Sequence, residues 1–566
     1  MTGRRIPPLA LVALVVVALL AAAGQAFAQA ASAGLEGVIG DTSGGVLPGA
    51  AVSVRHVETN QSRETVTDGN GLFRLTLLPV GEYELRVTFP GLAGYVRQGL
   101  LLAVGQTVRL TIDLAPASVT DTVTVKPDTP LLDPTQTSVA TAIDTERIEE
   151  LPIRSRDYLQ FTLLAPGVAS APPRAAVPGA TPLAGSGFTF GGIRPRANRL
   201  FIDGVENDDA YSGGSRTELS LEIVREFQVV TTGYSAESGG ASGGSINVIT
   251  KTGANTIHGD AFVFGQGGMF NARPFFEETG AARPGLRRVR AGGAVGGPIV
   301  KDRTFYYFAA EREYQRADDA SDIDPADAAA INDTLGKPGY AGLPTQKLRT
   351  GLFSTSRRET EASGKIVHRL SAGQSLMARY AFTANREAGD AFNTGGLVDW
   401  SGRGTTDVVD HALVGSLVSI VGPTATNDAR WQVSSRRADL STNQAEGPEI
   451  QIVGVADFGR PYTGNSNRWE RHYDAADTVT VNAGRHLFKA GGSVERITVD
   501  STSRDGFGGI YLFRDLAAFQ AGQTDDFRQV FGDPSTSLAT TRLAAFVQDR
   551  WTPAAHLTVD AGVRLD

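Results

Sequence analysis

Apolar and polar residues alternate along many short segments of this chain, which is the period of a β-strand with two different faces. Residues 256–566 contain eleven such segments, joined alternately by long and short connections. This arrangement is typical of an antiparallel transmembrane β-barrel, whose external loops are long and whose periplasmic turns are short. The last ten residues alternate without a fault, and one face carries Leu557, Val559, Ala561, Val563 and Leu565.

We expect the apolar side chains of this sheet to point outward and the charged side chains inward. An odd number of strands would leave the first and last strands on opposite sides, whereas bacterial single-chain barrels have an even number. Residues 256–566 are therefore interpreted as the N-terminal half of a barrel, truncated at the C-terminus and unable to transport as it stands. The long connections are expected at 266–289, 315–361, 387–405, 438–466 and 500–540.

A different β-rich pattern occupies residues 29–115. No helical period separates its β-branched runs, so they predict a sandwich of two packed sheets. The six runs, with Gly, Pro and Asp turns between them, lie at 35–41, 51–57, 62–68, 72–77, 82–88 and 107–114.

Residues 1–28 have the features of a secretory signal peptide. Arg4 and Arg5 precede an apolar run over 9–23, and Ala26 and Ala28 fit the small positions of a cleavage site. The run is shorter than the roughly 20 residues that span a bilayer, so a membrane anchor is the less favoured alternative.

The amino-acid composition excludes several kinds of functional site and one class of partner. The chain has no cysteine, which excludes disulfides, thiolate metal sites and cysteine nucleophiles. The net charge is −8, and no basic run follows the first five residues, so nucleic acid is not expected as a partner. Glycine makes up 66 of 566 residues, which fits a β-rich chain with many tight turns.

Residues 116–255 mix short helices with strands. A polar and valine-rich segment at 121–125 has prolines on both sides and cannot lie deep inside a sheet. It is suited to adding as a strand to the edge of a partner's sheet, and an interdomain linker is the alternative. Helical runs are expected at 146–150 and 156–164.

Two stretches resemble known families. GVIGDTSGGVLPGAAVSV and TDGNGLFRLTLLPVGEYELRVTFPG resemble the carboxypeptidase regulatory-like domain, which does not imply peptidase activity. LSLEIVREFQVVTTGYSAESGGASGGSINVITKTG resembles the plug domain of TonB-dependent outer-membrane receptors, more narrowly their Oar-like branch. The resemblance implies a mainly β protein with an N-terminal β-sandwich over 29–115, a TonB-box-like linker over 116–126, an α/β plug over 127–255 and an incomplete antiparallel barrel over 256–566.

The resemblance also implies functional residues. The family keeps its TonB box at the position of Asp121, Thr122, Val123, Thr124 and Val125, which we expect to bind a TonB-type periplasmic energy transducer. Polar loops of the plug are expected to contact the ligand, through Arg194, Arg196, Asn198, Asp208, Asp209 and Tyr211. For Arg194 and Arg196 the alternative is that they bridge the plug to carboxylates of the barrel.

No enzyme activity, cofactor or metal is expected. The G-x-S-x-G pattern at 240–244 continues into a strand, so it forms no nucleophile elbow. The seven histidines lie far apart, without a pair at metal-ligand spacing. The acidic cluster lacks the spacing of a calcium loop and is interpreted as an acidic loop; it comprises Asp203, Glu206, Asp208 and Asp209.

Two functions remain for the complete protein. The first is a TonB-dependent outer-membrane receptor that takes up an unidentified small or oligomeric ligand. The alternative is a non-transporting outer-membrane surface protein for adhesion or assembly. Both functions place the barrel in outer-membrane lipid and the N-terminal domain in the periplasm.

Overall fold

The computed structural model describes residues 32–117, 122–125, 138–153, 156–171, 187–272, 285–345, 347–392, 396–554 and 557–566. The expected signal peptide and Asp121 lie outside these residues. Among the helices that are described, none combines the length and the apolar composition needed to cross a membrane.

The N-terminal part is a sandwich of two sheets, as the sequence predicts. One sheet has the order β4-β1-β7, and the other begins with β3-β2-β5-β6. Their facing sides form one core that includes Leu35, Val54, Phe73 and Leu85. The strands are β1 (Ala33–Asp41), β2 (Ala51–His56), β3 (Ser62–Val66), β4 (Leu72–Leu78), β5 (Gly81–Thr88), β6 (Gly94–Leu102) and β7 (Thr107–Leu114).

Strand β6 is absent from the sequence prediction. Its segment contains Gly94 and Gly99, which interrupt the alternation of apolar and polar residues. Gly99 has a φ of 68°, and the pairing of β6 with β5 shifts register between Tyr83 and Leu85. A bulged strand of this kind hides its period, because one extra residue moves the following side chains to the other face.

The plug contains a five-stranded sheet of order β13-β12-β15-β14-β9. Every residue of β15 is buried, as expected for its central strand. The expected helix at 146–150 is α2 (Thr145–Glu150), whereas the run near 156–164 is the 3-10 helix η1 (Tyr158–Leu164). The strands are β9 (Val139–Ile143), β12 (Arg199–Ile202), β13 (Val205–Glu206), β14 (Val224–Thr232) and β15 (Ser245–Thr250).

The described residues after 257 contain one large antiparallel sheet of eleven strands, which confirms the predicted number. We call this sheet the barrel wall. Its strands are longer than predicted, so the connection expected at 315–361 is reduced to residues 321–351. The strands are β16 (His258–Gly267), β17 (Leu286–Val300), β18 (Thr304–Ala320), β19 (Leu352–Ser371), β20 (Gln374–Ala391), β21 (Arg403–Val421), β22 (Ala425–Thr442), β25 (Ser466–Ala483), β26 (His486–Ser503), β29 (Ser535–Ala554) and β30 (Leu557–Leu565).

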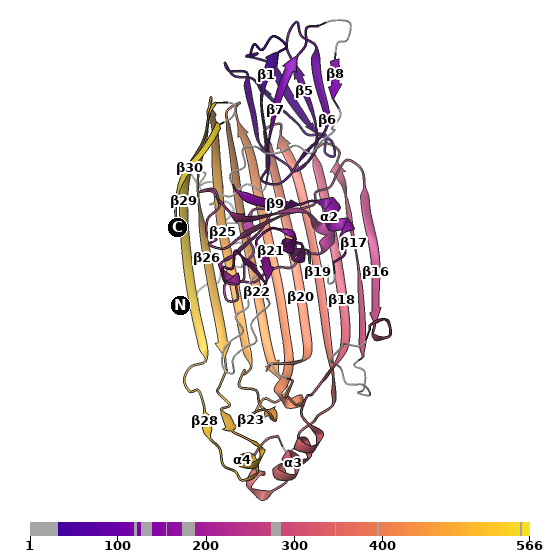
Figure 1. Cartoon of the computed structure of the whole chain (residues 1–566), viewed down its shortest axis with the longest axis vertical. Helices are drawn as coiled ribbons and strands as arrows, with labels where there is room; N and C mark the ends of the chain where they lie inside the picture. The colour runs from indigo at the N-terminus through magenta and orange to yellow at the C-terminus, as the bar shows by residue number, and fades with distance from the viewer. Residues whose placement is uncertain are drawn as a thin grey trace, which may run out of the picture.

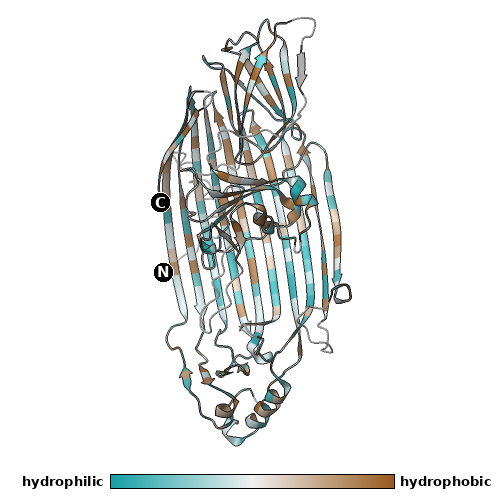
Figure 2. Ribbon diagram, in the orientation of Figure 1, coloured by the Kyte–Doolittle hydropathy of each residue, from teal (hydrophilic) through white to brown (hydrophobic). Residues whose placement is uncertain are grey.

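Hydrophobic and hydrophilic residues alternate along the strands of the barrel wall (Figure 2), and their exposure assigns them to opposite faces. On β25, Trp469 and Tyr473 are 50% and 47% exposed, whereas Glu470 and His472 are almost fully buried. A soluble protein would bury the aromatic side chains instead, so this is the apolar-outside pattern of a membrane barrel. The prediction of apolar outward and charged inward residues is confirmed.

Figure 1 shows the sandwich at one end of the barrel wall, the plug against its middle, and a small folded unit at the other end. This external unit is not predicted from the sequence. Its sheet has the order β24-β23-β27-β28 and shares a core with two helices. The elements are α3 (Pro325–Leu335), β23 (Glu449–Ile452), β24 (Ala456–Gly459), β27 (Ile510–Phe513), α4 (Leu516–Gln520) and β28 (Asp526–Arg528).

Candidate functional site

The interface between the plug and the barrel wall is built around Asp203. This residue lies in the two-residue turn between β12 and β13, where Asp203 and Gly204 have φ values of 50° and 80°. An Asp-Gly pair suits this turn because both residues must adopt positive φ. The carboxylate of Asp203 accepts hydrogen bonds from Thr250, through its amide at 3.1 Å and its hydroxyl at 2.7 Å.

Two basic side chains of the barrel wall reach the same carboxylate. Lys365 Nζ on β19 lies 3.1 Å from Asp203 Oδ1, and Arg379 Nε on β20 lies 2.7 Å from Oδ2. Burial favours the neutral carboxyl, but Lys365 and Arg379 outweigh it and hold the pKa of Asp203 well below its usual range. The plug is therefore fixed to the wall by a charged contact that is closed to water.

Asp209 makes a second charged contact, nearer the external end of the strands. Arg436, late in β22, donates to its Oδ2 at 2.7 Å, and Arg468, early in β25, donates at 2.6 Å. The amides of Tyr211 and Ser212 also donate to Asp209, at 2.9 and 2.6 Å. The contact therefore shapes the loop at 209–214 and ties it to the wall.

Asn198 and Asp208 are also buried and have partners inside the plug. The side-chain amide of Asn198 donates to the Phe188 carbonyl at 2.7 Å. Asp208 accepts from the Leu200 amide at 3.2 Å and from Arg199 at 3.3 Å. Burial raises the pKa of Asp208 well above its usual value, and the neighbouring Glu206 adds to this rise.

Arg194, Arg196 and Tyr211 are the exposed members of the predicted ligand set. Arg196 donates to the carbonyl of Ala210 at 2.9 Å and to that of Tyr211, so it joins the two predicted loops. The Tyr211 side chain is 52% exposed, and the guanidinium of Arg468 lies 4.7 Å from its ring centroid. In the described part of the chain neither Arg194 nor Arg196 pairs with a wall carboxylate, and both ligand binding and the bridge stay predictions for them.

The described part of the TonB-box-like segment is strand β8 (Thr122–Val125). It pairs in parallel with β6 at the edge of the sandwich, with Tyr95 opposite Val123 and Arg97 opposite Val125. Backbone pairing at a sheet edge needs an extended segment with few side-chain requirements. The segment therefore has the backbone form that the sequence predicts.

The sandwich also contacts the plug and the barrel wall through polar groups. The Val104 amide donates to Glu226 Oε1 at 2.5 Å, and Arg225 pairs with Glu58 at 2.9 Å. Arg74 NH1 donates to the Gly484 carbonyl in a short turn of the wall at 2.7 Å. Sequence analysis did not find these contacts, because nothing in the local pattern shows that residues so distant in the chain meet.

The family model of the outer membrane beta barrel domain matches residues 249–328 and 317–566. The model of the carboxypeptidase regulatory-like domain matches residues 34–115. The TonB-dependent transporter Oar of Myxococcus xanthus is 25% identical over 638 aligned residues, which cover 96% of this chain and 58% of that protein. The resemblance to TonB-dependent receptors of the Oar-like branch is thereby confirmed.

Among solved structures, an outer membrane transporter shares the fold of this chain. The outer membrane transporter YddB from Escherichia coli has a TM-score of 0.53 and 12% identity, and the match covers 75% of this chain and 56% of that one. The siderophore receptor PirA from Acinetobacter baumannii has a TM-score of 0.49 and 16% identity, over 76% and 57% of the two chains. The chain thus spans less than two thirds of the length of the relatives it matches.

Proposed function

Because the chain belongs to the outer membrane beta barrel family and lies in the outer membrane, we propose that the complete protein is a TonB-dependent receptor that takes up a ligand. In this proposal residues 29–115 are a periplasmic sandwich, 116–126 the linker with the TonB box, 127–255 the plug and 256–566 part of the barrel. The observation that carries the proposal is a folded plug held against the polar inner face of the wall by Asp203 and Asp209.

Beside a small apolar contact with Ala294, Tyr307, Ala309 and Ala381 of the wall, this interface is held by ion pairs and hydrogen bonds, which suits a plug that moves. Ion pairs and hydrogen bonds between plug and wall can be exchanged for bonds to water when the plug shifts, whereas a large apolar interface would expose its surface at a high free-energy cost. A cavity of about 710 Å³ between sandwich, plug and wall, lined among others by Thr76, Asn247 and Lys489, adds space beside the plug.

Energy would reach the plug through the TonB box. In the proposal strand β8 leaves β6. The box, which comprises Asp121, Thr122, Val123, Thr124 and Val125, then pairs with a sheet edge of the TonB-type transducer. Main-chain hydrogen bonds would supply most of the affinity in such a pairing. Pulling on this strand would then act on the plug, whose first described strand, β9, follows it in the chain.

The ligand would contact the exposed loop residues Arg194, Arg196 and Tyr211, with the external unit beside them. Asn198, Asp208 and Asp209 have internal partners, so in this proposal they position the loops until a ligand competes for those partners. Two arginines beside an aromatic ring favour a ligand with anionic and planar groups. The identity of the ligand is left to experiment.

The external unit is the observation that favours the alternative function. Helix α3, helix α4 and the strands β23, β24, β27 and β28 form an ordered platform with a buried core. An ordered external platform could support adhesion or assembly without transport. The two functions differ in their need for the TonB box.

Cross-linking in cells tests the proposal. The chain has no native cysteine, so Thr124→Cys gives a single thiol in the box. We expect it to form a disulfide with a cysteine placed in the edge strand of the TonB-type transducer, and Thr111→Cys on the exposed side of β7 serves as the control. Equal cross-linking at both positions, or none at Thr124→Cys in the presence of a proton motive force, would contradict the TonB-dependent function and favour the surface protein.

A further inference from the structure

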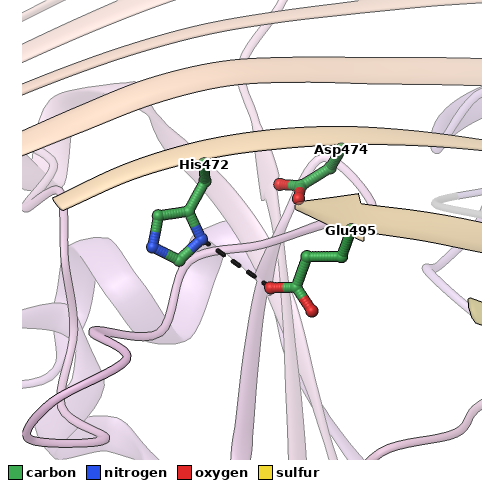
Figure 3. A group of neighbouring side chains, drawn as sticks. All are labelled: His472, Asp474 and Glu495. Carbon is green, nitrogen blue, oxygen red and sulfur yellow. Dashed lines mark ion pairs between the residues drawn. The ribbon is translucent and has the colours of Figure 1, made fainter. Parts of the chain in front are cut away.

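Three side chains with metal-ligating atoms meet on the inner face of the barrel wall, at His472, Asp474 and Glu495. His472 and Asp474 are two residues apart on β25 and so share one face. Glu495 on β26 is the direct cross-strand partner of Asp474. Figure 3 shows the three side chains turned toward one another, and the dashed line marks the approach of His472 Nδ1 to Glu495 Oε1 at 3.7 Å.

One polar atom of each of the three side chains forms a hydrogen bond or ion pair with a further residue. His472 Nε2 contacts Glu470 Oε1 at 2.5 Å, and Asp474 Oδ2 accepts from Gln432 Nε2 at 2.7 Å. Glu495 Oε2 pairs with Arg542 Nε at 3.1 Å. Residues that orient metal ligands in this way are typical of built sites, because they fix the ligand's direction before the ion binds.

The three side chains bring potential ligand atoms close together. One ligand atom from each residue lies within 4.8 Å of the others. Asp474 Oδ1 is buried and has no hydrogen-bond partner among the described residues, whereas Glu495 Oε1 has only the 3.7 Å approach of His472 Nδ1. Like charges directly opposite each other on neighbouring strands are destabilising, and a bound cation would offset the repulsion that the pairing of Glu495 with Arg542 leaves. A purely structural ion pair of His472 with Glu470 and Glu495 leaves Asp474 Oδ1 without a partner.

We propose that His472 Nδ1, Asp474 Oδ1 and Glu495 Oε1 bind a first-row divalent transition-metal cation such as Zn²⁺. One imidazole and two carboxylates suit Zn²⁺, whereas Ca²⁺ and Mg²⁺ prefer oxygen ligands alone. Bonds of about 2.0–2.2 Å to a tetrahedral ion place ligand atoms roughly 3.4 Å apart. The 3.7 Å separation of Nδ1 and Oε1 is close to this value, and the ligand atoms of all three residues, which lie within 4.8 Å of one another, would have to approach by up to about 1.4 Å.

The site is connected to the plug through Glu470. Its Oε1 accepts from the Ala210 amide of the plug at 3.0 Å as well as contacting His472. Binding of the ion would fix His472, and through Glu470 would favour the docked position of the loop at 209–214. This site does not depend on transport, and it is present whether the complete protein is a receptor or a surface protein.

Metal titration of the purified outer-membrane protein tests the site. The protein carries an affinity tag without histidine, and Co²⁺ is the probe because its visible absorption reports coordination. We expect one equivalent of Co²⁺ per chain, displaced by Zn²⁺. His472→Gln, Asp474→Asn and Glu495→Gln should each weaken binding at least tenfold, and Glu470→Gln about tenfold or more.

His411→Gln is the matched control. His411 is exposed on β21 and bonds to Tyr380 at 2.7 Å, so this variant should bind Co²⁺ as the unchanged protein does. If the unchanged protein holds no more Co²⁺ than the Asp474→Asn variant, the site is an ion pair and the proposal is wrong. If the variants fail to fold, electron paramagnetic resonance of Cu²⁺ bound to the unchanged protein tests the site. Hyperfine coupling to the nitrogen of one imidazole supports the site, and the absence of this coupling contradicts it.

Discussion

At the scale of single residues, Asp203 makes a buried charged contact between plug and wall with Lys365 and Arg379. Asp203→Asn leaves Lys365 and Arg379 buried without a counter-charge, and removing one partner of a buried charge pair costs about 3–5 kcal/mol. We expect the plug to loosen from the wall while the barrel stays folded. Hydrogen exchange of the amides of β15 would report this, and Asp113→Asn on the exposed face of β7 is the control.

Glu226 gives the contact between plug and sandwich a pH dependence. Burial raises the pKa of Glu226 to about 7 from an ordinary value of 4.5, although the Val104 amide and Arg225 oppose the rise and Asp144 adds to it. At a pH between these two pKa values, Glu226 is protonated in the folded chain and ionised in the unfolded chain. The stability of the contact therefore falls as pH rises from 4.5 to 7 and is constant above.

Glu226→Gln removes this dependence and keeps an oxygen that can accept from Val104. We expect the variant to be more stable than the unchanged protein at pH 8, by an amount on the order of 3 kcal/mol at most, and equal to it below pH 4.5. Thermal unfolding at pH 4 and pH 8 measures the difference. Glu82→Gln, on the sandwich strand β5 and exposed, should show no such change; a shift of equal size in both variants would contradict the assignment to Glu226.

Asn198, Asp208 and Asp209 show how much of a site can be read from a polar loop. Their residue types correctly indicate that the loops carry hydrogen-bonding groups. The sequence does not show that Asp209 meets Arg436 and Arg468, which follow it by more than two hundred residues. The inward stripe of Glu470, His472 and Asp474 is visible as alternation on β25, but the third ligand lies on another strand and no local spacing points to it.

At the scale of elements, prediction succeeds where one period holds. The barrel strands alternate over many residues because one face meets lipid and the other meets the polar plug, so their number follows from the sequence. The sequence does not predict strand β6, because its glycines interrupt the alternation of apolar and polar residues. The sequence does not predict the external unit either. Its strands β23, β24, β27 and β28 are only three or four residues long, and their stability comes from a core that three separate loops build together.

Strand β8 allows a test of the TonB box at this scale. Val123→Pro removes a backbone donor and fixes φ, so we expect it to abolish pairing with the TonB-type transducer and to weaken pairing with β6. Val123→Ala keeps the amide and should retain both. Cross-linking of Thr124→Cys in each background measures the first effect, and hydrogen exchange of β6 the second. Unchanged cross-linking in Val123→Pro would show that the box assignment is wrong.

At the scale of the whole molecule, the sandwich is predicted to fold without the rest. Its two sheets enclose a core of their own. Its contacts with plug and wall are polar, apart from a small apolar cluster of Val80 and Val104 with Ile249 of the plug. Residues 30–116, about 87 in number, are enough to form a single core. Expressed alone, this segment should be soluble and unfold in one cooperative transition in urea. A product without such a transition would contradict the proposed boundary.

The reversed polarity of the barrel wall leads to the last prediction. Val433 lies in the middle of β22 on the outer face, 40% exposed, with Leu413 and Tyr473 opposite it on the neighbouring strands. Val433→Lys places a charge in the lipid, which costs about 2–4 kcal/mol near the midplane of a barrel.

Val453→Lys is the control, because it changes an equally apolar and more exposed residue in the external unit, where the new charge faces water. We expect Val433→Lys to reduce folding into lipid vesicles, measured by heat-modifiable migration of the complete protein, and Val453→Lys to leave it unchanged. Equal folding of both variants would mean that this face of the sheet does not meet lipid.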